Sequence, residues 1–172
     1  MRLAKLLVGA AAVAVPAVAG ADMLAVGDHF PEWSLKDHTG VVVRSADLAG
    51  TTYLLWYYPK AMTSGCTAEG CALRDAFDGF TEAGVTILGV SFDDPEDNAK
   101  FVAKEHFPFR LLSDEDRKLA VAVGAADSPK RLWARRISYL VGPDGTVLKA
   151  YADVDPRTHA AQVLEDVRAL AR

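Results

Sequence analysis

The sequence has very little cysteine and no excess of positive charge. Only Cys66 and Cys71 carry thiols among its 172 residues, which is too few for a disulfide framework or a four-cysteine zinc site. Its 19 Lys and Arg residues stand against 23 Asp and Glu residues, a balance that argues against binding to a phosphate backbone. Disorder is also excluded, because 51% of the residues are hydrophobic. We expect one ordinary globular domain.

Long apolar runs are absent except at the N-terminus. There, Arg2 and Lys5 precede an apolar stretch over residues 6–18, and small residues follow it. This order is typical of a secretory signal peptide, and the small residues place the cleavage site after Ala19 or Ala21.

An uncleaved membrane anchor is the alternative interpretation of the same segment. The apolar stretch is shorter than the roughly 20 residues that a spanning helix needs, and Pro16 interrupts it. We therefore predict a signal peptide over residues 1–21 and a mature domain over residues 22–172, exported to the periplasm or to another compartment that permits disulfides. After cleavage no segment is apolar enough for stable membrane insertion.

The first half of the mature domain reads as a strand, a helix and a second strand. Residues 52–58 and 85–91 are continuous runs of β-branched, aliphatic and aromatic residues, typical of strands buried on both faces. Residues 66–83 lack proline and carry apolar residues at helical spacing, with Gly84 placed to end the helix. Strands connected through a helix in this way are expected to be parallel.

Turn and capping residues divide the rest of the chain into short elements. In chain order we expect a hairpin of residues 33–36 and 41–44, a helix from Asp94 to about Glu105, a strand over 109–112, a helix over 115–123, a loop over 124–134, a hairpin of strands 137–141 and 146–151, and a terminal helix capped by Asp155 and Pro156.

These elements predict an α/β fold. A βαβ half followed by a ββα half is the layout of a thioredoxin-like three-layer sandwich, with a central mixed β-sheet flanked by helices. The N-terminal β-hairpin is an addition to that layout.

The two cysteines lie where the first buried strand passes into its helix. Cys66 follows a glycine-containing loop and falls in the first turn of the predicted helix. Unpaired backbone N–H groups and the positive end of the helix dipole favour a thiolate at this position. The helix terminus alone is too weak to hold a thiolate at neutral pH, so a further donor is needed. Thr63, three residues earlier, is a candidate, and an arginine must come from elsewhere in the chain.

The spacing of the two cysteines excludes a static disulfide in an intact helix. Five residues along an ideal helix separate the Cα atoms by about 8.6 Å, which exceeds the roughly 7 Å that a disulfide spans without backbone movement. Either the segment is not helical when it is oxidised, or the bond forms after the helix locally unwinds.

Residues 58–75 resemble the active-site segment of the peroxiredoxins. The P-x-x-x-T-x-x-C core of that family is present as Pro59, Thr63 and Cys66. The C-x4-C spacing to Cys71 is similar to the peroxiredoxin Q subfamily, also called bacterioferritin comigratory protein, whose members are atypical two-cysteine thiol peroxidases. Arg136 and the strand after it resemble the arginine-bearing strand of the same subfamily, and the likeness covers about residues 25–170.

The resemblance implies an AhpC/TSA-type domain with a division of labour between the two thiols. Cys66 would attack the peroxide and become a sulfenic acid, and Cys71 would condense with it to an intramolecular disulfide. Thr63 and Arg136 would hold the peroxide oxygens and stabilise the thiolate, while Pro59 would shield the pocket.

The same resemblance implies the reaction partners. Hydrogen peroxide and organic hydroperoxides would be reduced to water and alcohols, and a thioredoxin-like or other dithiol reductant would reduce the disulfide. It implies antioxidant defence by a monomer that needs no cofactor, metal or nucleic acid.

Several residues keep a second interpretation. Strand alternation turns Arg135 and Arg136 to opposite faces, so Arg135 is the alternative active-site arginine. Glu69 either orients an arginine or lies on the helix surface. The acids Asp93 and Asp94 are read as helix-start residues, and the four histidines, which have no metal-ligand spacing, as structural or surface residues.

Two other functions remain as alternatives at this stage. An exported thioredoxin-like thiol-disulfide oxidoreductase would have C-x-x-C and a cis-proline before the later strand, whereas this chain has C-x4-C and two arginines there. A non-enzymatic binding domain with a structural disulfide would need a pairing that the helical spacing disfavours.

Overall fold

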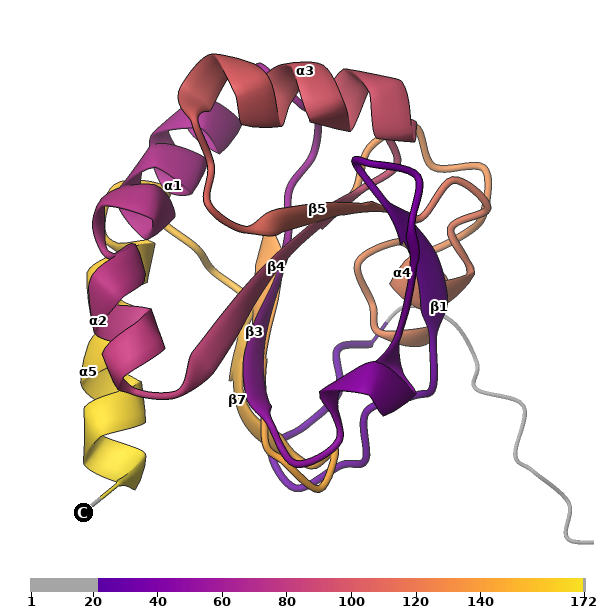
Figure 1. Ribbon diagram of the computed structural model, residues 1–172. Helices are drawn as coiled ribbons and strands as arrows, with labels where there is room; N and C mark the ends of the chain where they lie inside the picture. Colours follow the sequence, from indigo (N-terminus) through magenta and orange to yellow (C-terminus); the bar gives the residue numbers. More distant parts are fainter. Residues whose placement is uncertain (1–21, 172) are drawn as a thin grey trace, which may run out of the picture.

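Seven strands form one mixed sheet in the computed structural model, which describes residues 22–171 (Figure 1). The strands are β1 (Ser34–Asp37), β2 (Val42–Arg44), β3 (Thr52–Tyr57), β4 (Val85–Ser91), β5 (Arg110–Ser113), β6 (Ile137–Val141) and β7 (Val147–Tyr151). Their order is β2-β1-β5-β4-β3-β6-β7, and β4 pairs in parallel with both β3 and β5. All other neighbours are antiparallel, which confirms the predicted mixed sheet and both hairpins.

Helices cover the two faces of this sheet unequally. They are the 3-10 turn η1 (Ser45–Leu48) and the helices α1 (Ser64–Asp75), α2 (Phe77–Glu82), α3 (Pro95–Glu105), α4 (Lys118–Ala122) and α5 (His159–Leu170). Side chains of α1, α2, α3 and α5 share one buried cluster with one face of the sheet, whereas α4 and the segment around residues 30–33 pack on the other. The resulting three layers confirm the thioredoxin-like sandwich.

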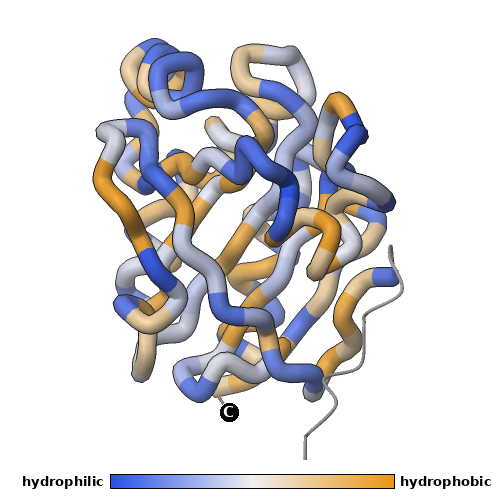
Figure 2. The backbone as a smooth tube through the Cα atoms, turned by 90° about the vertical axis from the view of Figure 1, so that its right-hand side faces the viewer, coloured by the Kyte–Doolittle hydropathy of each residue, from blue (hydrophilic) through white to orange (hydrophobic). Residues whose placement is uncertain are grey.

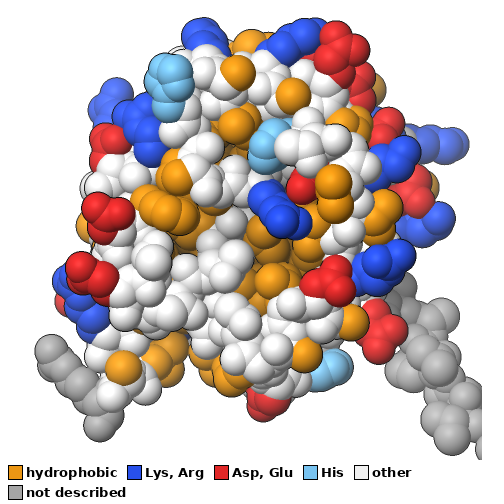
Figure 3. All heavy atoms as spheres, viewed as in Figure 1, with side chains coloured by type: hydrophobic (Ala, Val, Ile, Leu, Met, Phe, Trp, Pro, Cys, Tyr) orange, Lys and Arg blue, Asp and Glu red, His pale blue; other side chains and the backbone are white. Residues whose placement is uncertain are grey.

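Hydrophobic and hydrophilic segments separate along the chain as this layering requires. Figure 2 shows hydrophobic stretches passing through the interior and hydrophilic ones around it. Within β3, residues 53–57 are buried on both faces of the sheet, as its unbroken apolar run predicts. On the face drawn in Figure 3, hydrophobic side chains gather near the centre with charged ones around them. A shallow hollow of about 380 Å³ lies between α2, β4 and β5, and Phe77 and Phe109 are among its lining residues.

The prediction of one continuous helix over residues 66–83 is wrong, because the helix breaks at Ala76. This residue has φ −95° and ψ 3° and separates α1 from α2. The bend lets α2 pack on β4 while α1 packs against α3 and α5, which one straight helix on a twisted sheet could not do. Gly84 ends α2 as expected, with φ +69° and a hydrogen bond from its N–H to the oxygen of Thr81.

Two further helices begin later than expected. The helix expected over 115–123 shrinks to α4, because Arg117 takes a left-handed conformation (φ 58°) and the turn before it closes onto the oxygen of Asp114. The terminal helix begins at His159, because Asp155 caps the preceding turn instead and accepts a hydrogen bond from the N–H of Arg157. Asp94 does cap α3, accepting from the N–H of Asp97 at 2.8 Å.

Within residues 22–171, no helix is both long enough and apolar enough to cross a membrane. The expected signal peptide, residues 1–21, lies outside the described part of the chain.

Candidate active site

Cys66 lies in the first turn of α1, after the loop that follows the central strand. β3 ends at Tyr57, a loop spans residues 58–63, and α1 begins at Ser64. The loop turns sharply at Met62, where φ is 62°. Cys66 is therefore in the first turn of the helix, and it is fully buried. The positive end of the helix dipole favours negative charge on its sulfur.

Strand pairing brings Arg136 to this sulfur from a distant part of the sequence. β6 pairs with β3 in a register that sets Ile137 opposite Tyr57, so Arg136 emerges beside the loop that carries Cys66. Its Nη2 atom lies 3.4 Å from the Sγ atom of Cys66. A Cβ atom at Gly65 would lie 3.0 Å from the same nitrogen, so the glycine leaves room for the guanidinium group.

The neighbouring arginine points elsewhere. Arg135 donates from Nη1 to the backbone oxygen of Gly124 at 3.3 Å, and its Nη2 lies 3.9 Å from a carboxylate oxygen of Asp127. Of the two arginines that the sequence left open, the structure thus places Arg136 against the Cys66 sulfur.

Glu69 binds the other side of the same guanidinium group. Its Oε2 atom accepts a hydrogen bond from Nη1 of Arg136. The carboxyl group is fully buried, and no described residue is a hydrogen-bond partner of its Oε1 atom. Burial raises the pKa of Glu69 to about 7, although the charge of Arg136 opposes this shift. The structure therefore places Glu69 as an orienting partner of Arg136 rather than on the helix surface.

Thr63 and Pro59 lie in or next to the loop before α1, and none of the hydrogen bonds among the described residues joins either of them to Cys66 or Arg136. The exposed Thr63 donates its hydroxyl hydrogen to the backbone oxygen of Lys60 at 2.9 Å, so its lone pairs remain available. Pro59 lines a polar hollow of about 400 Å³ together with Lys60 and the exposed Trp133.

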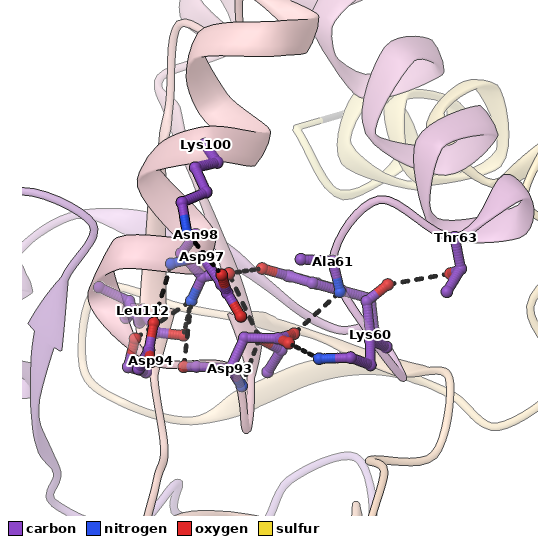
Figure 4. A network of polar contacts seen from close by, with 12 residues as sticks. Lys60, Ala61, Thr63, Asp93, Asp94, Asp97, Asn98, Lys100 and Leu112 are labelled. Carbon is purple, nitrogen blue, oxygen red and sulfur yellow. Dashed lines mark hydrogen bonds and ion pairs between the residues drawn. The ribbon is translucent and has the colours of Figure 1, made fainter.

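A buried carboxylate at the end of β4 fixes the loop before α1. Asp93 accepts a hydrogen bond from the N–H of Ala61 at 2.8 Å and pairs with Lys60. Its backbone oxygen accepts from the amide of Asn98, whose side-chain oxygen accepts from the hydroxyl of Tyr58 at 2.6 Å. Figure 4 shows these contacts joining the loop to the start of α3. Asp93 therefore holds the loop before α1, whereas the sequence suggested that it serves the start of the next helix.

Cys71 lies further along α1, beside α3. Both cysteines are free thiols in one continuous helix. The Sγ atom of Cys71 lies 3.6 Å from Oε2 of Glu105. Cys71 is partly exposed, and the pKa of its thiol is raised, chiefly by burial and also by the charge of Glu105.

A buried histidine, His159, lies near Arg136. His159 is fully buried at the start of α5, and its Nε2 atom lies 2.9 Å from Oγ of Ser138. Burial and the positive charge of Arg136 lower the pKa of His159 to about 4, so the ring is neutral at neutral pH. Among the described residues no group of three His, Cys, Asp or Glu side chains could hold a metal ion.

No role in this site was predicted from the sequence for Asp93, His159 or Glu105. The position of Asp93 directly after a buried parallel strand is a usable signal, because such strand ends line sites in α/β sheets. The burial of His159 follows from its place at the start of an amphipathic helix. Nothing in the sequence distinguishes Glu105 from the other acids of α3.

Comparison with known sequences places this site in a family. Residues 26–150 match the model of the AhpC/TSA family. The chain is 38% identical over 146 residues to Peroxiredoxin Bcp of Escherichia coli, an alignment that covers 82% of this chain and 94% of that protein. It is 34% identical over 148 residues to Peroxiredoxin Bcp of Bacillus subtilis, with 83% and 94% covered.

Solved structures agree with the sequence comparison. A PrxQ variant from Xylella fastidiosa superposes with a TM-score of 0.81 at 28% identity, covering 89% of this chain and all of that one. The bacterioferritin comigratory protein of Xanthomonas campestris, studied for alkyl peroxide reduction, has a TM-score of 0.75 at 30% identity and covers 81% of this chain and 92% of its own.

Proposed function

Since the chain belongs to the AhpC/TSA family and is a peroxiredoxin, a thiol peroxidase, we propose that it reduces hydrogen peroxide and organic hydroperoxides through Cys66. The observation that carries this proposal is the contact of 3.4 Å between Cys66 Sγ and Arg136 Nη2. A thiol in the first turn of a helix, with a guanidinium group beside it, lies in the electropositive surroundings that favour a reactive cysteine.

In the first step the Cys66 thiolate attacks one peroxide oxygen. The S–O bond forms, the O–O bond breaks, and the leaving oxygen takes a proton to become water or an alcohol. Negative charge moves from sulfur onto the leaving oxygen during this step, and Arg136 is placed to stabilise it. The partner Glu69 fixes the guanidinium plane through a charge-assisted hydrogen bond.

Two loop residues are assigned supporting roles in this step. Because the Thr63 hydroxyl already donates to Lys60, its oxygen is suited to accept a hydrogen bond from the peroxide O–H. Pro59 fixes the backbone before Lys60, and we assign to it the shielding of the thiolate that the family resemblance implies.

In the second step Cys71 resolves the sulfenic acid. The Cys71 thiol attacks the Cys66 sulfur, the S–S bond forms, the S–O bond breaks, and the hydroxyl leaves with the thiol proton as water. This step requires α1 to unwind locally, since the ideal helical separation of about 8.6 Å exceeds the reach of a disulfide.

Reduction of that disulfide completes the cycle. A thioredoxin-like or other dithiol donor attacks it by thiol–disulfide exchange and is itself oxidised to a disulfide. The reduced enzyme then refolds α1 with both thiols free, as in the structure.

Mass spectrometry after a single equivalent of peroxide tests this scheme. Wild-type protein is expected to lose two hydrogens and form a linkage between Cys66 and Cys71. The Cys71→Ser variant should gain one oxygen on Cys66 and then stall, and Cys66→Ser should show neither change. Full peroxidase activity in Cys66→Ser would sink the assignment.

We also propose that the protein acts after export, since residues 1–21 have the pattern of a signal peptide. Intact-mass measurement of the protein from its native cells is expected to show an N-terminus at position 20 or 22. Recovery of the full-length chain in a membrane fraction would favour the uncleaved anchor instead.

A further inference from the structure

One carboxylate lies in contact with Cys71, the resolving thiol of the proposed cycle. Glu105, in the last turn of α3, places Oε2 at 3.6 Å from the Sγ atom of Cys71. We propose that Glu105 is a positioning residue that holds Cys71 in the folded helix and so sets the rate at which the sulfenic acid is resolved. This inference rests on the proposed role of Cys71 as the resolving thiol.

The same residue is joined to α1 at a second point. Nη1 of Arg74, one turn after Cys71, donates to the backbone oxygen of Glu105 at 2.7 Å. The helix also lies close to the chain after α3, because a Cβ atom at Gly70 would overlap the ring of Phe107. Contacts through residues 70, 71 and 74 therefore hold one side of α1 against the end of α3.

Resolution requires these contacts to break. When Cys71 moves to the Cys66 sulfur, its thiol hydrogen must leave Glu105 and its turn of α1 must open. The reaction itself is balanced within the chain: the S–S bond forms, the S–O bond breaks, and water carries away the hydroxyl and the thiol proton. The free energy of the contact with Glu105 is then part of the barrier to resolution.

The charges around Cys71 also favour the hydrogen bond from its thiol to Glu105. Arg74 and Asp75 on its own helix and Glu105 on α3 face the thiol, and Lys104 lies 3.8 Å from the Glu105 carboxylate. Burial and the negative charges of Glu105 and Asp75 outweigh Arg74, so the pKa of the thiol is raised. Cys71 is thereby kept as a hydrogen-bond donor to Glu105 while the helix is folded.

Removal of the carboxylate is expected to speed resolution. In Glu105→Ala, decay of the dimedone-reactive sulfenic acid after one equivalent of peroxide should be about two- to tenfold faster, the range for loss of one hydrogen bond. The peroxide concentration that converts half of Cys66 to sulfinic acid should rise by the same factor, because excess peroxide competes with resolution. The rate of the first step should not change.

A matched variant on the same helix controls for charge and helix content. Glu96 is an exposed acid in the first turn of α3, paired with Lys100 at 3.0 Å. Glu96→Ala removes the same group from the same helix without touching α1, and it should resolve at the wild-type rate.

A second variant separates positioning from mere structural support. Glu105→Gln keeps the shape and an acceptor oxygen but removes the charge. In a Cys66→Ser background, the pH profile for alkylation of Cys71 should shift to lower pH with Glu105→Gln and stay unchanged with Glu96→Gln. A purely structural role would not move this profile.

The outcomes distinguish the inference from the function on which it rests. If Glu105→Ala resolves at or below the wild-type rate while Cys71→Ser still stalls, the inference about Glu105 is wrong and the peroxidase cycle stands. If Cys71→Ser turns over normally, the assignment of Cys71 fails first. An unshifted alkylation profile in Glu105→Gln would also overturn the inference.

Discussion

The Nη2 atom of Arg136 lies 3.4 Å from the sulfur of Cys66, although 70 residues separate the two in the sequence. The pairing of β3 with β6 makes this contact, since it aligns the end of one strand with the start of the other. The same guanidinium group binds the buried Glu69, so the orientation of the arginine is fixed before any substrate arrives.

Replacement of this arginine should slow the first step without unfolding the protein. Arg136→Lys loses the second donor that binds Glu69, and we expect the rate of reaction with hydrogen peroxide to fall about 100- to 1,000-fold, the range for loss of one preorganised donor. Stopped-flow oxidation of the reduced protein measures this rate. Arg135→Lys is the matched control and should stay within about threefold of wild type, and equal losses in both variants would contradict the assignment.

Glu69 should make stability depend on pH. Burial raises its pKa from 4.5 to about 7, so the folded state keeps a proton that the unfolded state has released. The stabilisation from this proton is complete below pH 4.5 and is lost as the pH rises through 7. Relative to Glu69→Gln, the wild type should lose up to about 3 kcal/mol over this interval. Urea unfolding of the reduced proteins at several pH values measures it, and a constant difference would argue against a buried carboxyl group.

His159 should act on stability in the opposite pH direction. Its pKa is lowered from 6.5 to about 4 by burial and by Arg136, so below pH 6.5 the unfolded state takes up a proton that the folded state refuses. Relative to His159→Gln, the wild type should therefore lose up to about 3 kcal/mol of unfolding free energy as the pH drops from 6.5 toward 4, because the contribution of Glu69 is common to both proteins. His29→Gln, at an exposed position, should follow the wild type. The measurement is urea unfolding, and equal slopes in all three proteins would refute the prediction.

Asp93 should matter for both the stability and the reactivity of the loop. Asp93→Asn removes the ion pair with Lys60 and weakens the hydrogen bond from Ala61, and we expect a loss of about 1–3 kcal/mol in unfolding free energy with slower oxidation of Cys66. Asp94→Asn makes the same change one residue later, where Asn still caps a helix, and it should cost little. Thermal unfolding and stopped-flow oxidation report both effects, and an unaltered Asp93→Asn protein would show that the loop is held by other contacts.

Local sequence signals were sufficient for most of the fold. The apolar runs that became β3 and β4 and the cap at Asp94 were predicted because each depends on neighbouring residues alone. The break at Ala76 was not, since alanine favours helix and only packing on a twisted sheet forces the bend. The late start of α5 has a similar cause, because Asp155 can cap either a turn or a helix and tertiary contacts decide which.

The residues of the site were also predictable only in part. Cys66 could be singled out because a family motif marks it, whereas Arg135 stayed an alternative to Arg136 until the strand pairing placed Arg136 at the sulfur. The acids that hold the site together could not be assigned from spacing alone, because Glu69, Asp93 and Glu105 are three of 23 acidic residues in the chain. Their importance comes from burial and from contacts between elements that are distant in the sequence.

The placement of both thiols on α1 also determines how the enzyme behaves on dilution. Because Cys66 and Cys71 belong to one helix of one chain, their encounter is unimolecular, and its half-time is the same at nanomolar and at millimolar protein. The effective concentration that each thiol experiences from the other depends on the five-residue spacing between them. It does not depend on the association of subunits. The disulfide proposed above should therefore close at the same rate in dilute and in concentrated protein.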